Sequence, residues 1–165
     1  MCFSKRKVII FAMKILLVSD SHGNDQILQD LYRQYPKMDL YLHAGDSSLD
    51  IEMIWPFISV KGNCDYYPFD DKYRLYTPIG YLLMKHKPFF TADEIKDNKI
   101  LIHGHTHKAY VKEEYGHILI CPGSVNLPRD GTEGTYVVLD ITTNLLTTTI
   151  YEINTKNVLY KIEIR

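Results

Sequence analysis

Short apolar runs alternate with polar loops along the first half of the chain. Residues 15–18, Ile-Leu-Leu-Val, form a run typical of a strand buried in an α/β sheet. Asn24 can cap a helix that follows, in which apolar residues recur at helical spacing until Pro36 ends it. Two more short apolar runs, at 40–43 and 57–60, predict further strands. This order of strands, polar loops and helix predicts an α/β fold.

The second half of the chain has the alternation of antiparallel strands. Residues 73–76 and 81–84 flank a turn and predict a hairpin. Thr91 and Glu94 form a capping box for a short helix over 91–97. Further strands are expected at 100–102, 118–120, 136–141, 147–153 and 158–164. The pattern predicts two packed mixed sheets with helices outside, and no linker divides this single domain.

Composition and charge narrow the class of protein. The 165 residues are 45% hydrophobic and 24% charged, as in an ordinary globular protein. Because 19 Lys and Arg stand against 20 Asp and Glu, nucleic acid is an unlikely partner. Three cysteines form no disulfide framework, which favours a reducing, cytoplasmic location. No apolar run reaches the roughly 20 residues of a membrane span, so no membrane partner is expected.

Polar side chains suited to metal ions follow the ends of the predicted strands. The predicted ligands are Asp20, His22, Asp46, Asn63, His86, His105 and His107. Carboxylate, imidazole and amide oxygen groups bind divalent transition metals without any thiolate. Ligands gather beyond the carboxyl ends of strands in open α/β sheets. Seven ligands exceed the needs of one ion, whereas two ions sharing a carboxylate would use them all.

The order of these motifs resembles the calcineurin-like metallophosphoesterase family. The motifs are Asp-x-His at 20–22, Gly-Asp at 45–46, Gly-Asn-x-Asp at 62–65, His86, and Gly-His-x-His at 104–107. The opening at 13–24 is similar to the family's small single-domain bacterial and archaeal phosphodiesterases. The resemblance covers about residues 13 to 140. It implies a four-layer α/β/β/α sandwich over residues 13–165, and leaves residues 1–12 as an extension without an assigned role.

The resemblance also implies a chemistry. Asp20, His22 and His107 would hold one metal ion. Asn63, His86 and His105 would hold a second, and Asp46 would bridge the two. Asp46, Asn63 and His86 would also be the catalytic residues. Two Mn²⁺ ions are expected, with Fe, Zn, Ni and Mg as alternatives, and a metal-bridging hydroxide would attack phosphorus in a small or nucleotide-like phosphate ester.

Two positions next to predicted ligands depart from the family pattern. Cys64 stands where many relatives have a histidine that protonates the leaving group, so esters with leaving groups of low pKa should be favoured. Packing is the favoured role for its thiol. Lys87 follows His86, where relatives usually have glycine, which makes His86 the least secure ligand. Candidates for contact with ligands or substrate are His43, His103, Cys64 and Arg129.

Two questions stay open at this stage. A non-catalytic scaffold on the same fold is the alternative to an enzyme, although the intact ligand set favours the enzyme. Aromatic residues cluster after the Gly-Asn-x-Asp motif. They suit either stacking on a nucleoside leaving group or a contact within a homo-oligomer.

Overall fold

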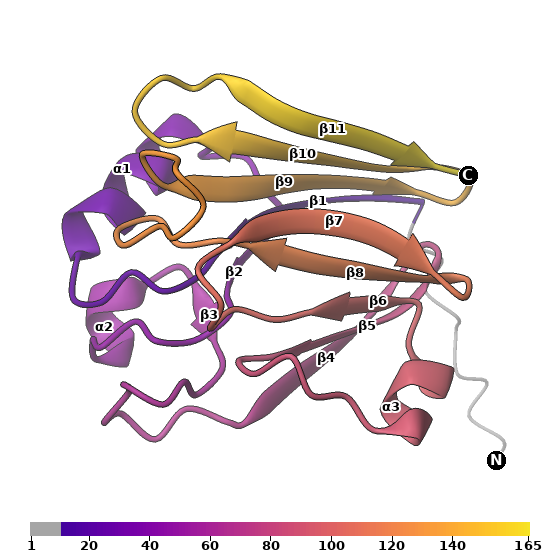
Figure 1. The fold of residues 1–165 in the computed structure, drawn as a ribbon, viewed down its shortest axis with the longest axis horizontal. Helices are drawn as coiled ribbons and strands as arrows, with labels where there is room; N and C mark the ends of the chain where they lie inside the picture. Colours follow the sequence, from indigo (N-terminus) through magenta and orange to yellow (C-terminus); the bar gives the residue numbers. More distant parts are fainter. Residues whose placement is uncertain (1–10) are drawn as a thin grey trace, which may run out of the picture.

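The computed structural model describes residues 11–165, in which two β-sheets pack face to face (Figure 1). The first sheet has the strand order β11-β10-β9-β1-β2-β3, and the second has the order β4-β5-β6-β8-β7. The strands of the first are β1 (Ala12–Val18), β2 (Leu40–His43), β3 (Ile58–Ser59), β9 (Thr135–Thr142), β10 (Leu146–Glu152) and β11 (Val158–Ile164). Those of the second are β4 (Lys72–Thr77), β5 (Gly80–Lys85), β6 (Ile100–Ile102), β7 (Ala109–Glu114) and β8 (His117–Pro122).

Both sheets are mixed, as the sequence predicts. In the first sheet β1 runs parallel to β2 and antiparallel to β9, and β2 runs parallel to β3. Helices α1 (Asp25–Gln34) and α2 (Ile51–Ile54) lie in the crossovers between these parallel strands. In the second sheet β5, β6 and β8 are parallel, while β4 and β7 pair antiparallel at the two edges.

The main core lies between the two sheets. Alternate residues of β1, Met13, Ile15 and Leu17, point into it, and Leu82 and Met84 of β5 meet them from the opposite sheet. All five side chains are buried. Leu16 and Val18 of β1 are also buried because they face the helices, whereas Lys14 is exposed. The apolar run at 15–18 is therefore continuous rather than alternating.

The outer face of the first sheet is covered by α1 and α2. Leu28 and Leu31 of α1 and Ile54 of α2 pack with Leu16 and Val18 of β1 in a second core. The Asn24 side chain accepts a hydrogen bond from the Ile27 amide at 3.2 Å, which confirms the predicted cap.

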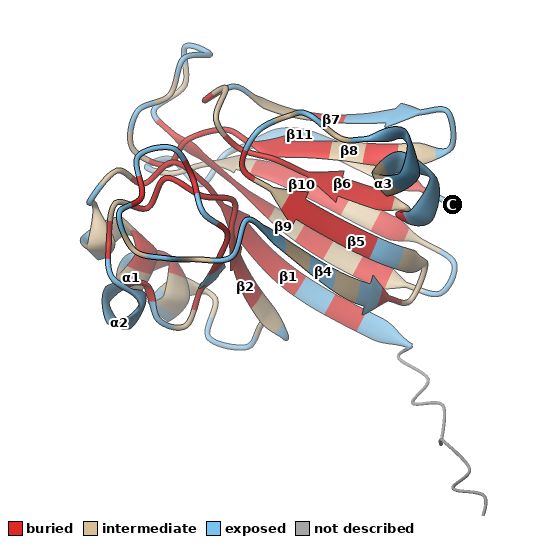
Figure 2. Ribbon diagram, turned by 90° about the horizontal axis from the view of Figure 1, so that it is seen from below, coloured by how far each residue is buried: buried red, intermediate tan, exposed pale blue. Residues whose placement is uncertain are grey.

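The outer face of the second sheet has a thinner cover. Its only helix in the described part of the chain is α3 (Ala92–Asp97), and no residue of α3 is buried (Figure 2). The predicted capping box of Thr91 and Glu94 is present. The four-layer architecture is thus confirmed, with one short helix forming most of the fourth layer.

Two elements were missed by the sequence pattern. Strand β7 ends in Lys112, Glu113 and Glu114, and only Val111 of its six residues is buried, so its sequence has the polarity of a loop. Helix α2 has four residues, too few for a helical period. Residues 1–10 of the predicted extension lie outside the described residues, and Ala12 already belongs to β1. No helix in the described range has the length and apolar character needed to cross a membrane.

The loops after β2, β3 and β6 pack so closely that they need glycine. A Cβ on Gly62 would lie 2.0 Å from Oδ1 and 2.3 Å from the amide nitrogen of Asp46. A Cβ on Gly104 would lie 2.0 Å from the Ser19 hydroxyl oxygen. The glycines of the sequence motifs therefore let loops from different strands touch at one edge of the sandwich.

Replacing Gly62 tests this packing. Gly62→Ala should lower the free energy of unfolding by about 3 kcal/mol, because the new methyl group collides with backbone that cannot yield. Gly131→Ala is the matched control, since a Cβ there meets nothing within 4 Å and only the positive φ of 82° costs about 1 kcal/mol. Urea denaturation of both variants makes the comparison, and equal losses would contradict the packing argument.

Candidate metal centre

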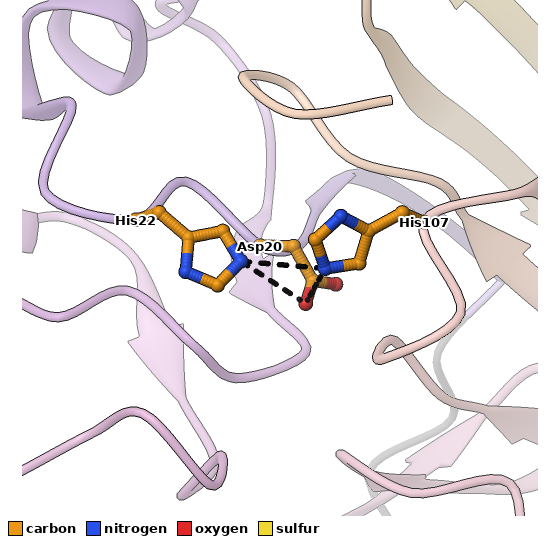
Figure 3. A group of neighbouring side chains, drawn as sticks. All are labelled: Asp20, His22 and His107. Carbon is orange, nitrogen blue, oxygen red and sulfur yellow. Dashed lines mark hydrogen bonds and ion pairs between the residues drawn. The ribbon is translucent and has the colours of Figure 1, made fainter. Parts of the chain in front are cut away.

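The loops after β1 and β6 bring three predicted ligands together: Asp20, His22 and His107 (Figure 3). Nε2 of His107 lies 3.1 Å from Oδ1 of Asp20, and Nε2 of His22 lies 3.8 Å from the same oxygen. The two Nε2 atoms are 3.3 Å apart. Three ligand atoms thus converge on one point from two different sheets.

The carboxylate of Asp20 is fully buried, and only one of its two oxygens has hydrogen-bond partners among the described residues. Its Oδ2 accepts hydrogen bonds from the Ser19 hydroxyl at 2.5 Å and from the His105 amide at 3.0 Å. Its Oδ1 is buried and has no hydrogen-bond partner among the described residues. Burial raises the pKa of Asp20 above its ordinary value. A cation at Oδ1 would satisfy this oxygen, so the residues present fit a metal ion.

A second cluster joins Asp46, Asn63, His86 and His105. Nε2 of His86 lies 3.3 Å from Oδ2 of Asp46 and 3.0 Å from Oδ1 of Asn63. Nδ1 of His105 lies 2.9 Å from the same Asn63 oxygen and 3.3 Å from Nε2 of His86. This cluster also draws on both sheets, because Asp46 and Asn63 follow β2 and β3 whereas the histidines follow β5 and β6.

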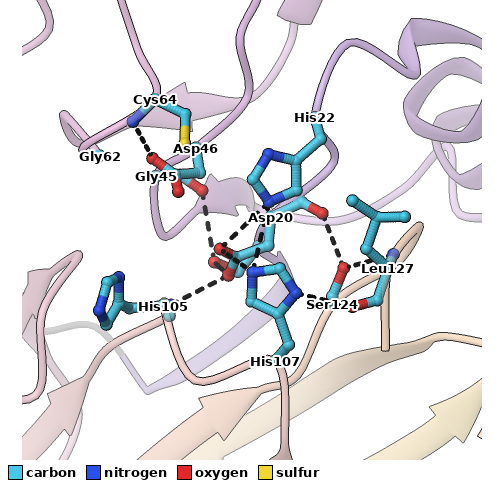
Figure 4. Close-up of polar contacts among 12 residues, drawn as sticks. Asp20, His22, Gly45, Asp46, Gly62, Cys64, His105, His107, Ser124 and Leu127 are labelled. Carbon is cyan, nitrogen blue, oxygen red and sulfur yellow. Dashed lines mark hydrogen bonds and ion pairs between the residues drawn. The ribbon is translucent and has the colours of Figure 1, made fainter. Parts of the chain in front are cut away.

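Asp46 of the second cluster also lies near His22 of the first (Figure 4). Ligand atoms of Asp46, His86 and His105 lie within 4.8 Å of one another, and so do ligand atoms of Asp46, His22 and Cys64. Burial alone would raise the pKa of Asp46. The contact with the His86 ring and a hydrogen bond from the Cys64 amide instead hold that pKa well below its usual range. Asp46 is therefore an anion placed to contact both clusters.

Hydrogen bonds fix the orientation of two imidazole rings. Nδ1 of His86 donates to the Ala44 carbonyl at 2.8 Å, and Nδ1 of His107 donates to the Leu127 carbonyl at 2.6 Å. A carbonyl can only accept, so in each neutral ring the proton sits on Nδ1. The unprotonated Nε2 then faces its cluster, as in histidines that bind metals.

The backbone at the predicted ligands is unusual. The positive φ values are 54° at Asp20, 44° at His22, 58° at Asp46, 69° at His105 and 59° at His107. Non-glycine residues rarely adopt this region, and each instance costs roughly 1–3 kcal/mol. Five of the seven predicted ligands share it, and such strain clusters at functional sites.

Asp65 holds the loops in place and is missing from the predicted site residues. Its carboxylate accepts hydrogen bonds from the amides of Gly62 at 2.7 Å, Asp46 at 2.9 Å and Ser48 at 2.8 Å. The Ser47 hydroxyl donates to it as well, at 3.1 Å. The Gly-Asn-x-Asp motif was the sequence signal for this residue. Its fourth position orients the loops after β2 and β3 rather than facing the cluster.

His43 and His103 lie behind the centre. Nδ1 of His43 accepts from the Gly45 amide at 3.2 Å, and its Nε2 donates to the Ser21 hydroxyl at 2.9 Å. Burial lowers the pKa of His43 to about 4, so the ring is neutral. His103 is buried between the Gly104 carbonyl and the Tyr110 hydroxyl. Hydrogen bonds of both rings thus stabilise loops that contain predicted ligands.

Cys64 and Arg129 differ in their placement. The packing role favoured for Cys64 is wrong, because its thiol is exposed and within 4.8 Å of ligand atoms of His22 and Asp46. Arg129 is exposed, and its side chain makes no hydrogen bond or ion pair with the described residues. Only its amide contacts the centre's loops, donating to the His107 carbonyl at 2.9 Å.

The Ser124 hydroxyl makes hydrogen bonds that connect two loops. Its hydroxyl donates to the Asp20 carbonyl at 2.8 Å and accepts from the amides of Asn126 and Leu127. With its hydrogen bonds used in this way, Ser124 ties the segment after β8 to the segment after β1.

The chain matches proteins of known family. Residues 13–144 match the calcineurin-like phosphoesterase superfamily domain. The probable metallophosphoesterase YsnB of Bacillus subtilis (strain 168) is 30% identical over 155 residues, which cover 85% of this chain and 91% of YsnB. The phosphodiesterase YfcE of Escherichia coli (strain K12) is 29% identical over 164 residues, covering 78% of this chain and 88% of YfcE.

Solved structures share the fold. A predicted phosphoesterase from Streptococcus pneumoniae TIGR4 superposes with a TM-score of 0.81 at 22% identity, covering 94% of this chain and 98% of that one. Vps29 of Entamoeba histolytica complexed with zinc superposes with a TM-score of 0.65 at 19% identity, covering 92% and 98%. The match over residues 13–144 and the similarity to YsnB show that the chain belongs to the calcineurin-like phosphoesterase superfamily.

Proposed function

We propose that the protein is a phosphodiesterase that works with two divalent metal ions on small or nucleotide-like phosphate esters. One observation carries this proposal: two clusters of ligand atoms meet at Asp46, and a buried carboxylate oxygen of Asp20 has no partner beside them. The relationship to YfcE, named a phosphodiesterase, supports the choice of a diester as substrate.

The two clusters suggest which residues would hold each ion. Asp20, His22 and His107 would hold the first. Asn63, His86 and His105 would hold the second, with Asp46 contacting both. A mixed set of nitrogen and oxygen ligands suits Mn²⁺, the metal we propose, and also suits Fe, Zn, Ni or Mg. Lys87 is exposed, so its charge can point to solvent and leave His86 free to bind.

The chain's own contribution is positioning. When bound, a pair of such cations activates water and neutralises charge on phosphoryl oxygens. The Nδ1–H groups of His86 and His107 donate hydrogen bonds to carbonyl oxygens, which leaves Nε2 of each ring as the atom that can bind a metal ion. It holds Asp46 through the amide of Cys64 at 2.7 Å. Ser124 is engaged in structural hydrogen bonds and is not proposed as a nucleophile.

A scaffold without catalysis is the second candidate. The likeness to Vps29, at 19% identity, concerns the fold alone. Two complete clusters of ligand atoms favour the enzyme over the scaffold. Metal bound by the wild-type protein without any turnover of bis(p-nitrophenyl) phosphate would decide for the scaffold. A cytoplasmic location, the absence of a nucleic-acid partner and a homo-oligomer stay predictions.

Removing a ligand should abolish activity. His107→Ala and Asp46→Ala should each lower Mn²⁺-dependent hydrolysis of bis(p-nitrophenyl) phosphate by at least about 100-fold, because even the outer partners of metal ligands are worth 10- to 100-fold. Elemental analysis should show less bound metal, and circular dichroism should show the fold retained. His117→Ala is the control. His117 is the first residue of β8, and its ring contacts the Asn98 carbonyl rather than either ligand cluster. Turnover near the wild-type level in either ligand variant would refute the assignment.

Adding and removing metal should change stability as well as activity. Dialysis against a chelator should remove the activity, and Mn²⁺ at about 100 times its dissociation constant should then add about 2.7 kcal/mol to the free energy of unfolding. Thermal melts with and without Mn²⁺ measure this. The His107→Ala variant should show a much smaller increase. An equal increase in both proteins would place the ions elsewhere.

The leaving group should matter because Cys64 is a weak acid. Burial, and then the charge of Asp46, raise the pKa of its thiol, so it protonates a leaving oxygen poorly. Cys64→His should speed the hydrolysis of diesters with alkyl leaving groups by about 100-fold, the lower range for general acid catalysis. It should change p-nitrophenyl esters little. A series of aryl and alkyl diesters measures the difference, and a uniform change across the series would argue against this role.

A further inference from the structure

A cavity of about 340 Å³ opens beside the second ligand cluster. Its lining includes Asn63 and His86 of that cluster and three lysines, Lys61, Lys85 and Lys87. The lysines come from different segments. Lys61 follows β3, Lys85 ends β5, and Lys87 lies in the loop after β5. Positive side chains therefore surround one side of a centre that would itself bind cations.

Two of these three lysines have no acidic partner. Nζ of Lys85 forms an ion pair with Glu94 at 3.0 Å and donates to the Phe89 carbonyl at 2.8 Å. Lys61 and Lys87 are exposed, and their ammonium groups make no ion pair or hydrogen bond with the residues the structure describes. Asp71 is the acidic residue in the lining, and against it Lys61 and Lys87 leave the cavity with an excess of positive charge.

Lys87 affects the cluster electrostatically. Lys87 directly follows His86 and lines the same cavity, so its ammonium group would repel a metal cation held by His86 and His105. An anion in the cavity would offset this repulsion. The repulsion would otherwise weaken the second metal site without benefit.

We propose that this cavity is an anion subsite in which Lys61 and Lys87 bind a second phosphate group of the substrate. The inference rests on the proposed function and refines it. The preferred substrate is a phosphodiester that carries an additional terminal phosphate, as in a nucleotide phosphorylated on its sugar. The second phosphate would sit beside Asn63 and His86, next to the phosphorus that reacts.

The test compares two substrates that differ by one phosphate. These are thymidine 5′-(p-nitrophenyl phosphate) and its 3′-phosphorylated counterpart, assayed on the Mn²⁺-loaded protein. The wild type should show a kcat/KM at least about fivefold higher for the phosphorylated substrate, about the value of one exposed charge pair, mainly through a lower KM. Raising the salt concentration should reduce this preference, because the lysines are exposed.

Substitutions of Lys61 and Lys87 test whether these lysines cause the substrate preference. Lys61→Gln and Lys87→Gln should each reduce the ratio of the two kcat/KM values, and the double variant should bring it close to one. Lys87→Arg should keep the ratio, because the charge is kept. Lys112→Gln is the matched control, since Lys112 pairs with Glu114 on the edge strand β7, three strands away from β5.

The outcomes separate the two proposals. Hydrolysis of both substrates at equal kcat/KM by the wild type would overturn the subsite and leave the phosphodiesterase in place. A preference that persists in the double variant would overturn the role of these lysines. Metal-loaded protein that hydrolyses neither substrate would overturn the phosphodiesterase, and the subsite with it.

Discussion

The buried carboxylate of Asp20 is the constraint on which the arrangement of the site depends. A fully buried anion needs compensation, and the chain supplies it to Oδ2 only, through Ser19 and the His105 amide. Oδ1 faces His22 and His107 without a hydrogen bond among the described residues. The fold thus builds a position for positive charge and surrounds it with ring nitrogens that can share it. The remaining ligands extend the same principle through Asp46.

Placing these side chains requires strained backbone conformations, and the stability of the rest of the sandwich must offset their cost. Five ligands adopt positive φ, and three motif glycines press against ligand side chains or their neighbours. The apolar layer between the sheets supplies stabilisation that does not depend on the site, because residues such as Ile15 and Met84 are completely buried. Asp65 adds local support, since its carboxylate joins two loops at once.

Much of this could be predicted from the sequence, for identifiable reasons. Strands with a clear apolar run, such as 15–18, and helices with side-chain caps, such as the one after Asn24, were placed correctly. Strand β7 was missed because pairing with β8, rather than its own polarity pattern, makes it a strand. The motifs also predicted residues that the structure brings together in two clusters. They did not predict the exposure of Cys64 or the contacts of Asp65, because both depend on how loops distant in sequence meet.

Each cluster of ligand atoms takes residues from both sheets, since Asp20 and His22 face His107, and Asp46 and Asn63 face His86 and His105. An ion in either cluster would act as a cross-link between the two halves of the sandwich. Sliding of one sheet over the other would then be opposed by coordination at this edge as well as by the apolar layer. Occupancy of the centre would therefore be coupled to the relative position of the two sheets.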